Sequence, residues 1–216
     1  WKEMNIVIIN YNSGNLASLI NAISKTAKKY EIACKVDISN KPKEILNADR
    51  VILPGVGDFY NCKKQLEKIK NIDEILDEYI KKKERPFLGI CIGMQLMAKV
   101  SYERNKNKGL GFFDSEVKLI KKKSHNIKIP HMGRNDVFIK KDRKNFFSSL
   151  NNNNFYFVHS YHMQCKNEDE VLAYVNYGEK LVAAVCKNNI LGVQFHPEKS
   201  QIIGQQFLKE FLVWMP

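Results

Sequence analysis

The sequence predicts an α/β protein with a doubly wound, mostly parallel central sheet flanked by helices, and with additional antiparallel strands in its second half. Two observations lead to this fold class. Short apolar runs alternate with amphipathic helical patterns up to about residue 95, which is typical of parallel strands joined by helices. Beyond residue 115, short strand-like runs separated by turns replace this alternation. No stretch resembles a linker, so residues 1–216 are predicted to form a single domain.

The first half of the chain contains four predicted strands, at 5–9, 34–38, 51–53 and 87–90. Helical spacing of apolar residues predicts helices over 16–28, 59–69 and 72–82, and a further helix beginning near Gly93. The loops after residues 9, 53 and 90 follow the carboxyl ends of their strands. Ligands of doubly wound sheets bind at that edge, so we expect the functional site there.

The second half is predicted to be mainly strands and turns. The strand-like runs cover 117–120, 127–129, 135–139, 155–160, 171–174, 181–186 and 190–195. Four consecutive asparagines at 151–154 indicate a surface turn, and an amphipathic helix is predicted over 201–214.

Composition favours a folded protein of the cytoplasm. The apolar fraction is 44%, and no apolar run of about 18 residues suggests a membrane span. Five scattered cysteines, an odd number without a Cys-x-x-Cys pair, argue against a disulfide framework and a zinc site. We therefore expect no bound metal and no cofactor. The residues Trp1-Lys2-Glu3, which precede Met4, are interpreted as a cloning remnant.

The formal net charge of +12 raises the possibility of nucleic-acid binding. However, the lysine runs are dispersed over different loops and helix ends, without interleaved aromatic residues. Neither a nucleic acid nor a membrane is therefore expected as a partner.

Cys91 is the candidate nucleophile. It follows the predicted strand 87–90 and lies between Gly89 and Gly93, in the Gly-x-Cys-x-Gly spacing of a nucleophile elbow. A sharp strand-to-helix turn needs residues without a β-carbon on both sides, and the helix N-terminus favours a thiolate. A lone cysteine in an apolar run can equally be core filler. The two glycines favour the nucleophile.

His196 and Glu198 complete a candidate catalytic triad. They follow the last predicted strand, at the same edge of the sheet as Cys91. A cysteine nucleophile needs a base that takes its proton, and a third group that orients the imidazole. The order Cys…His-x-Glu supplies all three groups.

With these residues in place, the chain resembles the class I (triad) glutamine amidotransferases over nearly its whole length, from Met4 to the final helix. Among them it is most similar to the glutaminase subunits of imidazole glycerol phosphate synthases. The motifs that carry the resemblance are the segments at 54–57, 89–95, 109–111, 130–133, 157–161 and 192–200.

The resemblance implies that Cys91 attacks the side-chain amide of glutamine, that His196 protonates the departing ammonia, and that Glu198 orients His196. It also implies two oxyanion donors, the backbone N–H of Ile92 and one from the loop Gly55-Val56-Gly57. The glycines of this loop would allow a peptide flip, so that a carbonyl faces the oxyanion site in a resting state. The implied glutamine-binding residues are Gln95, Glu103, Ser160, Tyr161 and His162.

The resemblance further implies a (β/α)₈-barrel synthase subunit as heterodimer partner, because ammonia must reach its acceptor without entering bulk water. The residues that match the docking side are Asn12, Asn15, Arg134 and Lys199. Arg134 stands where the family usually has tryptophan, and Asn10 and Asn12 stand where it usually has Asp and Gly. These departures leave the triad intact but leave the identity of the partner open.

Three alternatives to a histidine-pathway glutaminase remain at this point. The chain could be a paralogue that supplies ammonia to an amidino-sugar synthase for surface polysaccharide. It could be a cysteine-elbow peptidase of the same fold, although such an enzyme would not need Gln95, the 54–57 loop and the 196–198 motif together. A catalytically silent interaction subunit is disfavoured because every position of the triad is filled.

Overall fold

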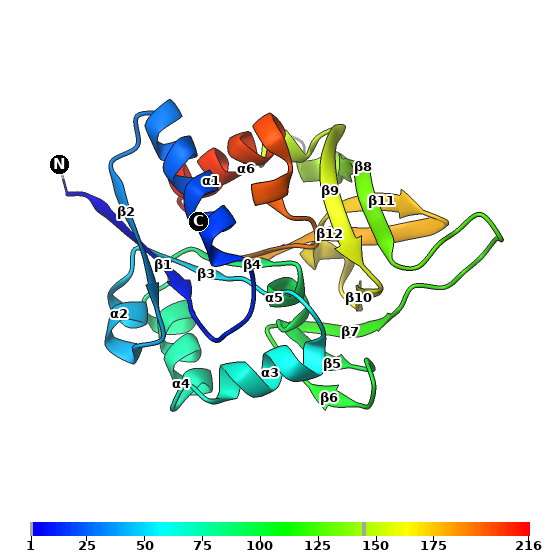
Figure 1. Cartoon of the computed structure of the whole chain (residues 1–216), viewed down its shortest axis with the longest axis horizontal. Helices are drawn as coiled ribbons and strands as arrows, with labels where there is room; N and C mark the ends of the chain where they lie inside the picture. Colours follow the sequence, from blue (N-terminus) through cyan, green and yellow to red (C-terminus); the bar gives the residue numbers. More distant parts are fainter. Residues whose placement is uncertain (1, 144–145) are drawn as a thin grey trace.

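The computed structural model describes residues 2–143 and 146–216, so Trp1 of the predicted cloning remnant lies outside the described residues. The described residues form two sheets (Figure 1). One has nine strands in the order β2-β1-β3-β4-β13-β12-β11-β8-β9, and the other has four in the order β10-β7-β5-β6. Strands from both halves of the chain meet in the large sheet. The predicted α/β class is therefore confirmed.

One half of the large sheet is parallel. Its strands are β2 (Cys34–Ser39), β1 (Met4–Ile9), β3 (Arg50–Leu53), β4 (Phe87–Ile90) and β13 (Ile190–Val193). Every residue of β3, β4 and β13 is buried, because helices cover both faces. This explains why these strands are continuous apolar runs in the sequence.

The helices form a layer on each face of this parallel half (Figure 1). The helices α1 (Leu16–Lys29) and α6 (Gln201–Val213) pack together on one face. The opposite face carries α2 (Pro42–Asn47), α3 (Phe59–Glu67) and α4 (Ile72–Asp77), the last continuing as a π-helical turn, Glu78–Lys82. This arrangement is the predicted doubly wound core.

The other half of the large sheet is antiparallel. It consists of β12 (Glu179–Lys187), β11 (Val171–Tyr177), β8 (His131–Ile139) and β9 (Asn153–His159). Buried and partly buried residues alternate along β9, as expected where one face of a sheet is less covered than the other. The sheet is thus mixed, with its parallel pairs confined to the half that contains Cys91.

The smaller sheet lies beside the carboxyl edge of the parallel strands (Figure 1). It contains β10 (Tyr161–Cys165), β7 (Phe113–Leu119), β5 (Ala98–Ser101) and β6 (Asn107–Lys108). The chain crosses from the large sheet to this one at Ser160, between β9 and β10. The remaining short elements are the helix α5 (Ile92–Gln95) and 3₁₀ turns at Lys141–Arg143, Ser148–Leu150, Glu168–Glu170 and Pro197–Lys199.

The strand predicted at 127–129 is wrong, because residues 120–130 run as a loop. The Ile127 side chain packs on the turn of the β11–β12 hairpin instead of joining a sheet. A β-carbon at Gly178 would lie 3.0 Å from the side chain of Ile127. The Tyr177 hydroxyl also donates to the Lys128 carbonyl. The elements α2, β5, β6 and β10 were not predicted from the sequence.

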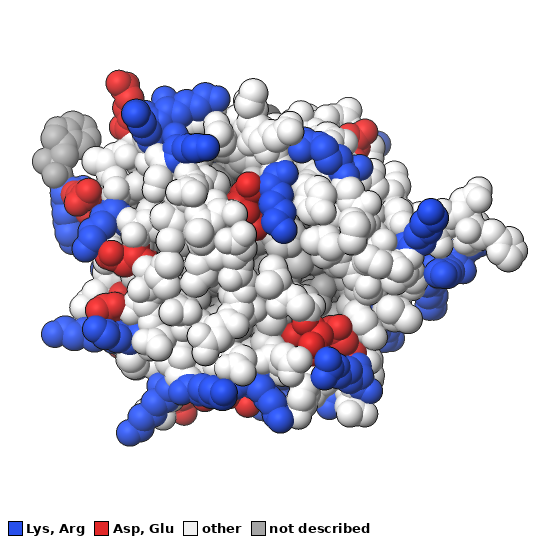
Figure 2. Space-filling view, viewed as in Figure 1, with Lys and Arg blue, Asp and Glu red and all other residues white. Residues whose placement is uncertain are grey.

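The surface charge is dispersed over the face shown in Figure 2, where Lys and Arg occupy separate groups near the periphery and the centre is mostly uncharged. Among residues 2–143 and 146–216, no helix combines the length and the apolar character that crossing a membrane requires.

Candidate active site

Cys91 occupies a strained turn between β4 and α5. Its backbone has φ 54° and ψ −112°, a conformation that a residue with a side chain rarely adopts. A β-carbon at Gly93 would lie 1.9 Å from the Leu53 carbonyl oxygen, and one at Gly89 would lie 2.8 Å from the Gly93 carbonyl oxygen. Only glycines therefore allow α5 to pack this closely against β3 and β4, as the sequence spacing predicted.

His196 and Glu198 form an ordered pair next to Cys91. They follow β13, which pairs with β4 in parallel, so both strands end at the same edge. The His196 Nδ1 atom lies 2.6 Å from Glu198 Oε1, and His196 is 2% exposed. With Nδ1 donating to the carboxylate, Nε2 is the atom left for Cys91 and a substrate. Among the described residues this buried Nε2 has no hydrogen-bond partner.

The surroundings of His196 favour the imidazolium. Burial lowers the pKa of His196, but Cys91 and Glu198 outweigh burial and raise it to about 10. A negative charge on the Cys91 sulfur would have this effect. The surroundings of His196 therefore favour its protonated form, which Glu198 holds through Nδ1.

We expect the pair of His196 and Glu198 to make stability depend on pH in the alkaline range. The folded-state pKa of His196 lies above the unfolded value of about 6.5, so its contribution is complete below pH 6.5 and is lost as the pH rises through about 10. Urea unfolding between pH 6.5 and 10 should show a steeper loss of unfolding free energy in the wild type than in His196→Gln. Parallel pH dependence in the two proteins would contradict the assignment.

A cleft of about 450 Å³ opens over Cys91 and His196. Its lining brings together most of the residues predicted from the sequence: Asn15, Val56, Gly57, Cys91, Ile92, Gln95, Glu103, Ser160, Tyr161, His196 and Lys199. Pro130, Val158 and His159 complete the lining. Such a volume suits a small polar molecule such as an amino acid.

Five predicted residues lie outside the lining of this cleft: Gly55, Glu198, His162, Asn12 and Arg134. His162 is buried and faces β12, with its Nε2 3.9 Å from Glu179 Oε1, and burial lowers its pKa. Asn12 is exposed in the β1–α1 loop, where it has φ 61°. Arg134 projects from β8 and donates to the Asn154 side-chain oxygen at 2.6 Å. The spacing of residues along helices and strands does not show whether the side chains of His162, Asn12 and Arg134 face the cleft.

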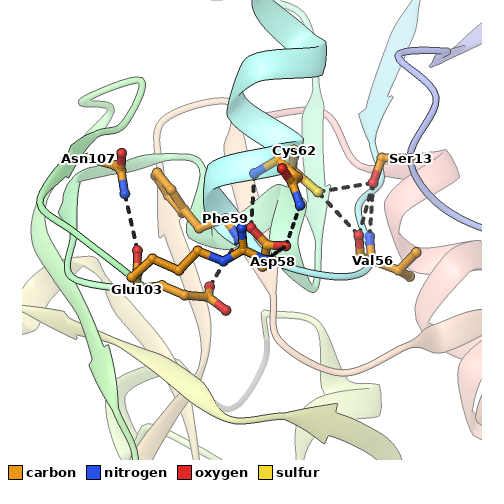
Figure 3. Close-up of polar contacts among 9 residues, drawn as sticks. Ser13, Val56, Asp58, Phe59, Cys62, Glu103 and Asn107 are labelled. Atoms are coloured by element: carbon orange, nitrogen blue, oxygen red, sulfur yellow. Dashed lines mark hydrogen bonds and ion pairs between the residues drawn. The ribbon is translucent and has the colours of Figure 1, made fainter.

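The loop at residues 54–57 presents a carbonyl to the expected oxyanion site. The Ile92 N–H donates to the Gly55 carbonyl oxygen at 3.3 Å. The Val56 N–H points away and donates to the Ser13 hydroxyl at 3.2 Å, while the Cys62 thiol donates to the Val56 carbonyl at 3.2 Å (Figure 3). The Ile92 and Val56 N–H groups are thus both engaged within the protein, and the loop has its Gly55 carbonyl facing the start of α5.

Glu103 lies at the N-terminus of α3 as well as in the cleft. Its Oε2 accepts from the Phe59 N–H at 3.0 Å (Figure 3). Burial raises the pKa of this carboxyl group. Asp58 caps the same helix through Asn61 N–H at 3.0 Å and pairs with Arg104 at 3.1 Å. One carboxylate oxygen of Glu103 is therefore fixed, and its side chain is held at the cleft wall.

Gln194 is a cleft-side residue that the sequence analysis did not single out. It is buried, its Nε2 lies 3.7 Å from the Cys91 sulfur, and its Oε1 accepts from Gln95 Nε2 at 3.0 Å. Its position two residues before His196 at a strand end was the available signal. Ser13 in the β1–α1 loop and Cys62 in α3, which hold Val56, gave no signal because neither segment carries a comparable motif.

Within the described ranges 2–143 and 146–216, no group of three or more His, Cys, Asp or Glu side chains is arranged to hold a metal ion. The cleft lining itself presents the thiol of Cys91, the imidazole of His196 and the carboxylate of Glu103.

Comparison with known proteins identifies the family. The model of the family "Glutamine amidotransferase class-I" matches residues 7–215, and the chain therefore belongs to the class I glutamine amidotransferases, enzymes that hydrolyse glutamine. The imidazole glycerol phosphate synthase subunit HisH of Brucella melitensis is 38% identical, covering 99% of this chain and 100% of that protein. The HisH subunit of Rhodospirillum rubrum is 39% identical with the same coverage.

Solved structures share the fold at lower identity. A glutamine amidotransferase crystal structure superposes with a TM-score of 0.67 and 18% identity, covering 95% of this chain and 98% of that one. A glutamine amidotransferase from Thermotoga maritima has a TM-score of 0.58 and 17% identity, covering 97% and 82% of the two chains. At these identities the likeness concerns the fold alone.

Proposed function

We propose that this chain is the glutaminase subunit of an imidazole glycerol phosphate synthase, and that it hydrolyses glutamine through a Cys91–His196–Glu198 triad. The observation that carries the proposal is that Cys91 and His196 line one cleft, with Glu198 Oε1 2.6 Å from His196 Nδ1. The end-to-end similarity to HisH subunits supports the assignment to histidine biosynthesis.

In the proposed first half-reaction, the Cys91 thiolate attacks the side-chain amide carbon of glutamine and gives a tetrahedral oxyanion. His196 then delivers its Nε2 proton to the amide nitrogen, the C–N bond breaks, and ammonia leaves. The product on the enzyme is a glutamyl thioester. Glu198 keeps the imidazole in the required tautomer throughout, through its hydrogen bond to Nδ1.

In the second half-reaction, His196 takes a proton from water, which attacks the thioester carbon. The C–S bond breaks, glutamate is released, and the proton on His196 again pairs with the Cys91 thiolate. The raised pKa of His196, about 10, suits a resting state in which this proton is already in place.

The proposed substrate contacts follow from the cleft lining. The Gln95 Oε1 atom is buried and lacks a hydrogen-bond partner among the described residues, so it can accept from the amide of glutamine. Glu103 supplies negative charge for the α-ammonium group. Ser160 and Tyr161 line the cleft where the α-carboxylate would lie, whereas the buried His162 lies outside the cleft and has no proposed contact.

The carbonyl-inward loop, with the Gly55 carbonyl facing the start of α5, represents a resting state in this proposal. Stabilising the oxyanion requires that the peptide between Gly55 and Val56 turns over, which withdraws the Gly55 carbonyl and presents the Val56 N–H. The loop would turn when a (β/α)₈-barrel synthase subunit docks over the cleft beside Asn12, Asn15 and Lys199. Docking would also shield the released ammonia from water on its way to the acceptor.

The test of this function is glutamate formation from glutamine by the purified chain, with and without a barrel synthase subunit. Glutamate formation that depends on the barrel supports the proposal. Hydrolysis of peptides without any action on glutamine would instead support the peptidase alternative.

Arg134 provides a test of which synthase subunit is the partner. Its guanidinium is satisfied by Asn154 in the free chain, through bonds of 2.6 Å to the side-chain oxygen and 2.7 Å to the carbonyl. Burying it at an interface without a carboxylate would be costly. We expect Arg134→Trp to weaken association with the true partner in calorimetric titration, without changing Cys91 alkylation in the free chain.

A barrel subunit from the sugar-amidation pathway serves as the comparison. If the histidine-pathway assignment holds, the wild type binds the histidine-pathway barrel more tightly than the sugar-pathway barrel. Equal affinities in all four pairings of the two variants with the two barrels would show that Arg134 carries no information about the partner.

A further inference from the structure

Two buried histidines that the proposed mechanism does not use form a hydrogen-bonded chain to the cleft wall. The His131 Nδ1 atom lies 3.0 Å from His159 Nε2, and His159 Nδ1 lies 2.8 Å from the Tyr161 carbonyl oxygen. At the other end, the Asn135 Nδ2 atom lies 3.2 Å from His131 Nε2. The chain thus runs from β8, through β9, to the first residue of β10.

The hydrogen-bond partners fix every proton in this chain. The Tyr161 carbonyl can only accept, so His159 must carry its proton on Nδ1. A neutral His159 then accepts at Nε2, which requires the proton of His131 to be on Nδ1 as well. His131 Nε2 is left to accept from the Asn135 amide. Any other pair of neutral tautomers places two protons or two lone pairs face to face.

The environment keeps both rings neutral. Burial lowers the pKa of His131 to about 4, and burial lowers that of His159 to about 3. His131 is also stacked between Phe157 and Tyr177, with ring centroids at 4.8 and 4.1 Å. The two histidines are therefore fixed hydrogen-bonding groups at neutral pH, with no free nitrogen for proton transfer.

The Tyr161 carbonyl, at the end of this chain of hydrogen bonds, is part of the cleft wall formed by residues 158–161. The Tyr161 carbonyl also accepts from Gln95 Nε2 at 3.0 Å, and Gln95 in turn bonds to Gln194 next to Cys91. Residues 158–161 line the cleft at the crossing between the two sheets. The Val158 carbonyl lies 4.0 Å from the Cys91 sulfur. A small shift of this segment would move the substrate relative to the nucleophile.

We propose that His131 and His159 are positioning residues. They hold residues 158–161 of the cleft wall at a fixed position relative to Cys91, so that glutamine is oriented for attack. This inference rests on the proposed glutaminase function, and it adds residues that touch neither the glutamine nor the sulfur in that mechanism. The His131–His159 bond joins directly opposed residues of β8 and β9, so the wall is fixed to the antiparallel half of the large sheet.

The variants His131→Phe and His131→Gln form a matched pair. Phenylalanine retains the stacking between Phe157 and Tyr177 but removes both hydrogen bonds, whereas glutamine retains one donor and one acceptor. In the complex with the barrel subunit, His131→Phe should raise the KM for glutamine about tenfold, as expected for loss of the one buried hydrogen bond that leads to the cleft wall, from His131 to His159. His131→Gln should recover most of this loss, and kcat should change less than KM in both.

Two alkylating reagents distinguish a positioning role of His131 from a general loss of structure or thiol reactivity at the site. A glutamine-shaped diazoketone needs the binding wall to reach Cys91, whereas iodoacetamide needs only an accessible thiolate. In His131→Phe, inactivation by the diazoketone should slow about tenfold while alkylation by iodoacetamide stays within about twofold of the wild type. Unchanged diazoketone inactivation, or equal slowing with both reagents, would overturn the positioning role.

The wild-type protein supplies a measurement that needs no variant. Proton–nitrogen NMR of the imidazole rings should show His131 and His159 both protonated on Nδ1 and bare on Nε2 at neutral pH. A proton on Nε2 of His159 would overturn the hydrogen-bond chain. If the wild type is not labelled by the diazoketone at Cys91, the proposed function itself fails. If it is labelled and the variants match it, only the positioning role fails.

Discussion

Replacement of Cys91 by alanine is expected to abolish hydrolysis of glutamine, with a loss in turnover of about 10⁶, as for other triad nucleophiles. The reason is that the cleft offers one thiol, at the strained turn beside His196, and no second nucleophile can form the thioester. Glutamate formation by the assembled complex measures the loss. Synthesis with added ammonium salts should survive, because the barrel subunit then receives ammonia directly.

Cys165→Ala is the matched control. This cysteine is half-buried in β10, and burial raises its pKa to about 12, so it is a poor nucleophile. The control should retain wild-type glutaminase activity. Substantial activity in Cys91→Ala, or an equal loss in the two variants, would contradict the proposed mechanism.

The second large effect that we expect is activation of glutamine hydrolysis by the partner subunit. The isolated chain holds the Gly55 carbonyl against the Ile92 N–H, and the Ser13 hydroxyl holds the Val56 N–H. One missing oxyanion donor typically reduces turnover about 10²–10³-fold. We therefore expect glutamate formation to rise by about this factor when the barrel subunit and its acceptor substrate are added. Steady-state assays at saturating glutamine measure the ratio.

The control for activation is the rate of Cys91 alkylation by iodoacetamide, which does not need an oxyanion hole. It should change far less than glutaminase turnover when the partner binds. Full turnover by the isolated chain, unchanged by the partner, would show that the carbonyl-inward loop is not a resting state.

The fold could be predicted in its parallel half because the central strands there, β3, β4 and β13, are buried on both faces. β1, β3, β4 and β13 are continuous apolar runs in the sequence, and each lies at its predicted position. The antiparallel half was less predictable. Ile127 packs on a hairpin turn rather than in a strand, a tertiary contact that an apolar run in the sequence does not distinguish from sheet pairing.

The candidate site could be predicted where a backbone constraint selects the residue type. Gly93 is fixed by the Leu53 carbonyl, and the position of Cys91 follows from it. His162 lies outside the lining of the cleft, because the first residue of β10 faces the cleft while the second faces β12. The contact of Ser13 with Cys62, 49 residues apart, could not be predicted because it depends on the packing of α3 beside the β1–α1 loop.

Covalent labelling tests the central claim most directly, because it reports which residue attacks the glutamine amide position. The complex is treated with a glutamine-shaped diazoketone, digested, and analysed by mass spectrometry. We predict a single adduct on Cys91, with excess glutamine protecting against it, and no adduct on Cys34, Cys62, Cys165 or Cys186. An adduct on another cysteine, or labelling of Cys91 that glutamine does not slow, would contradict the account.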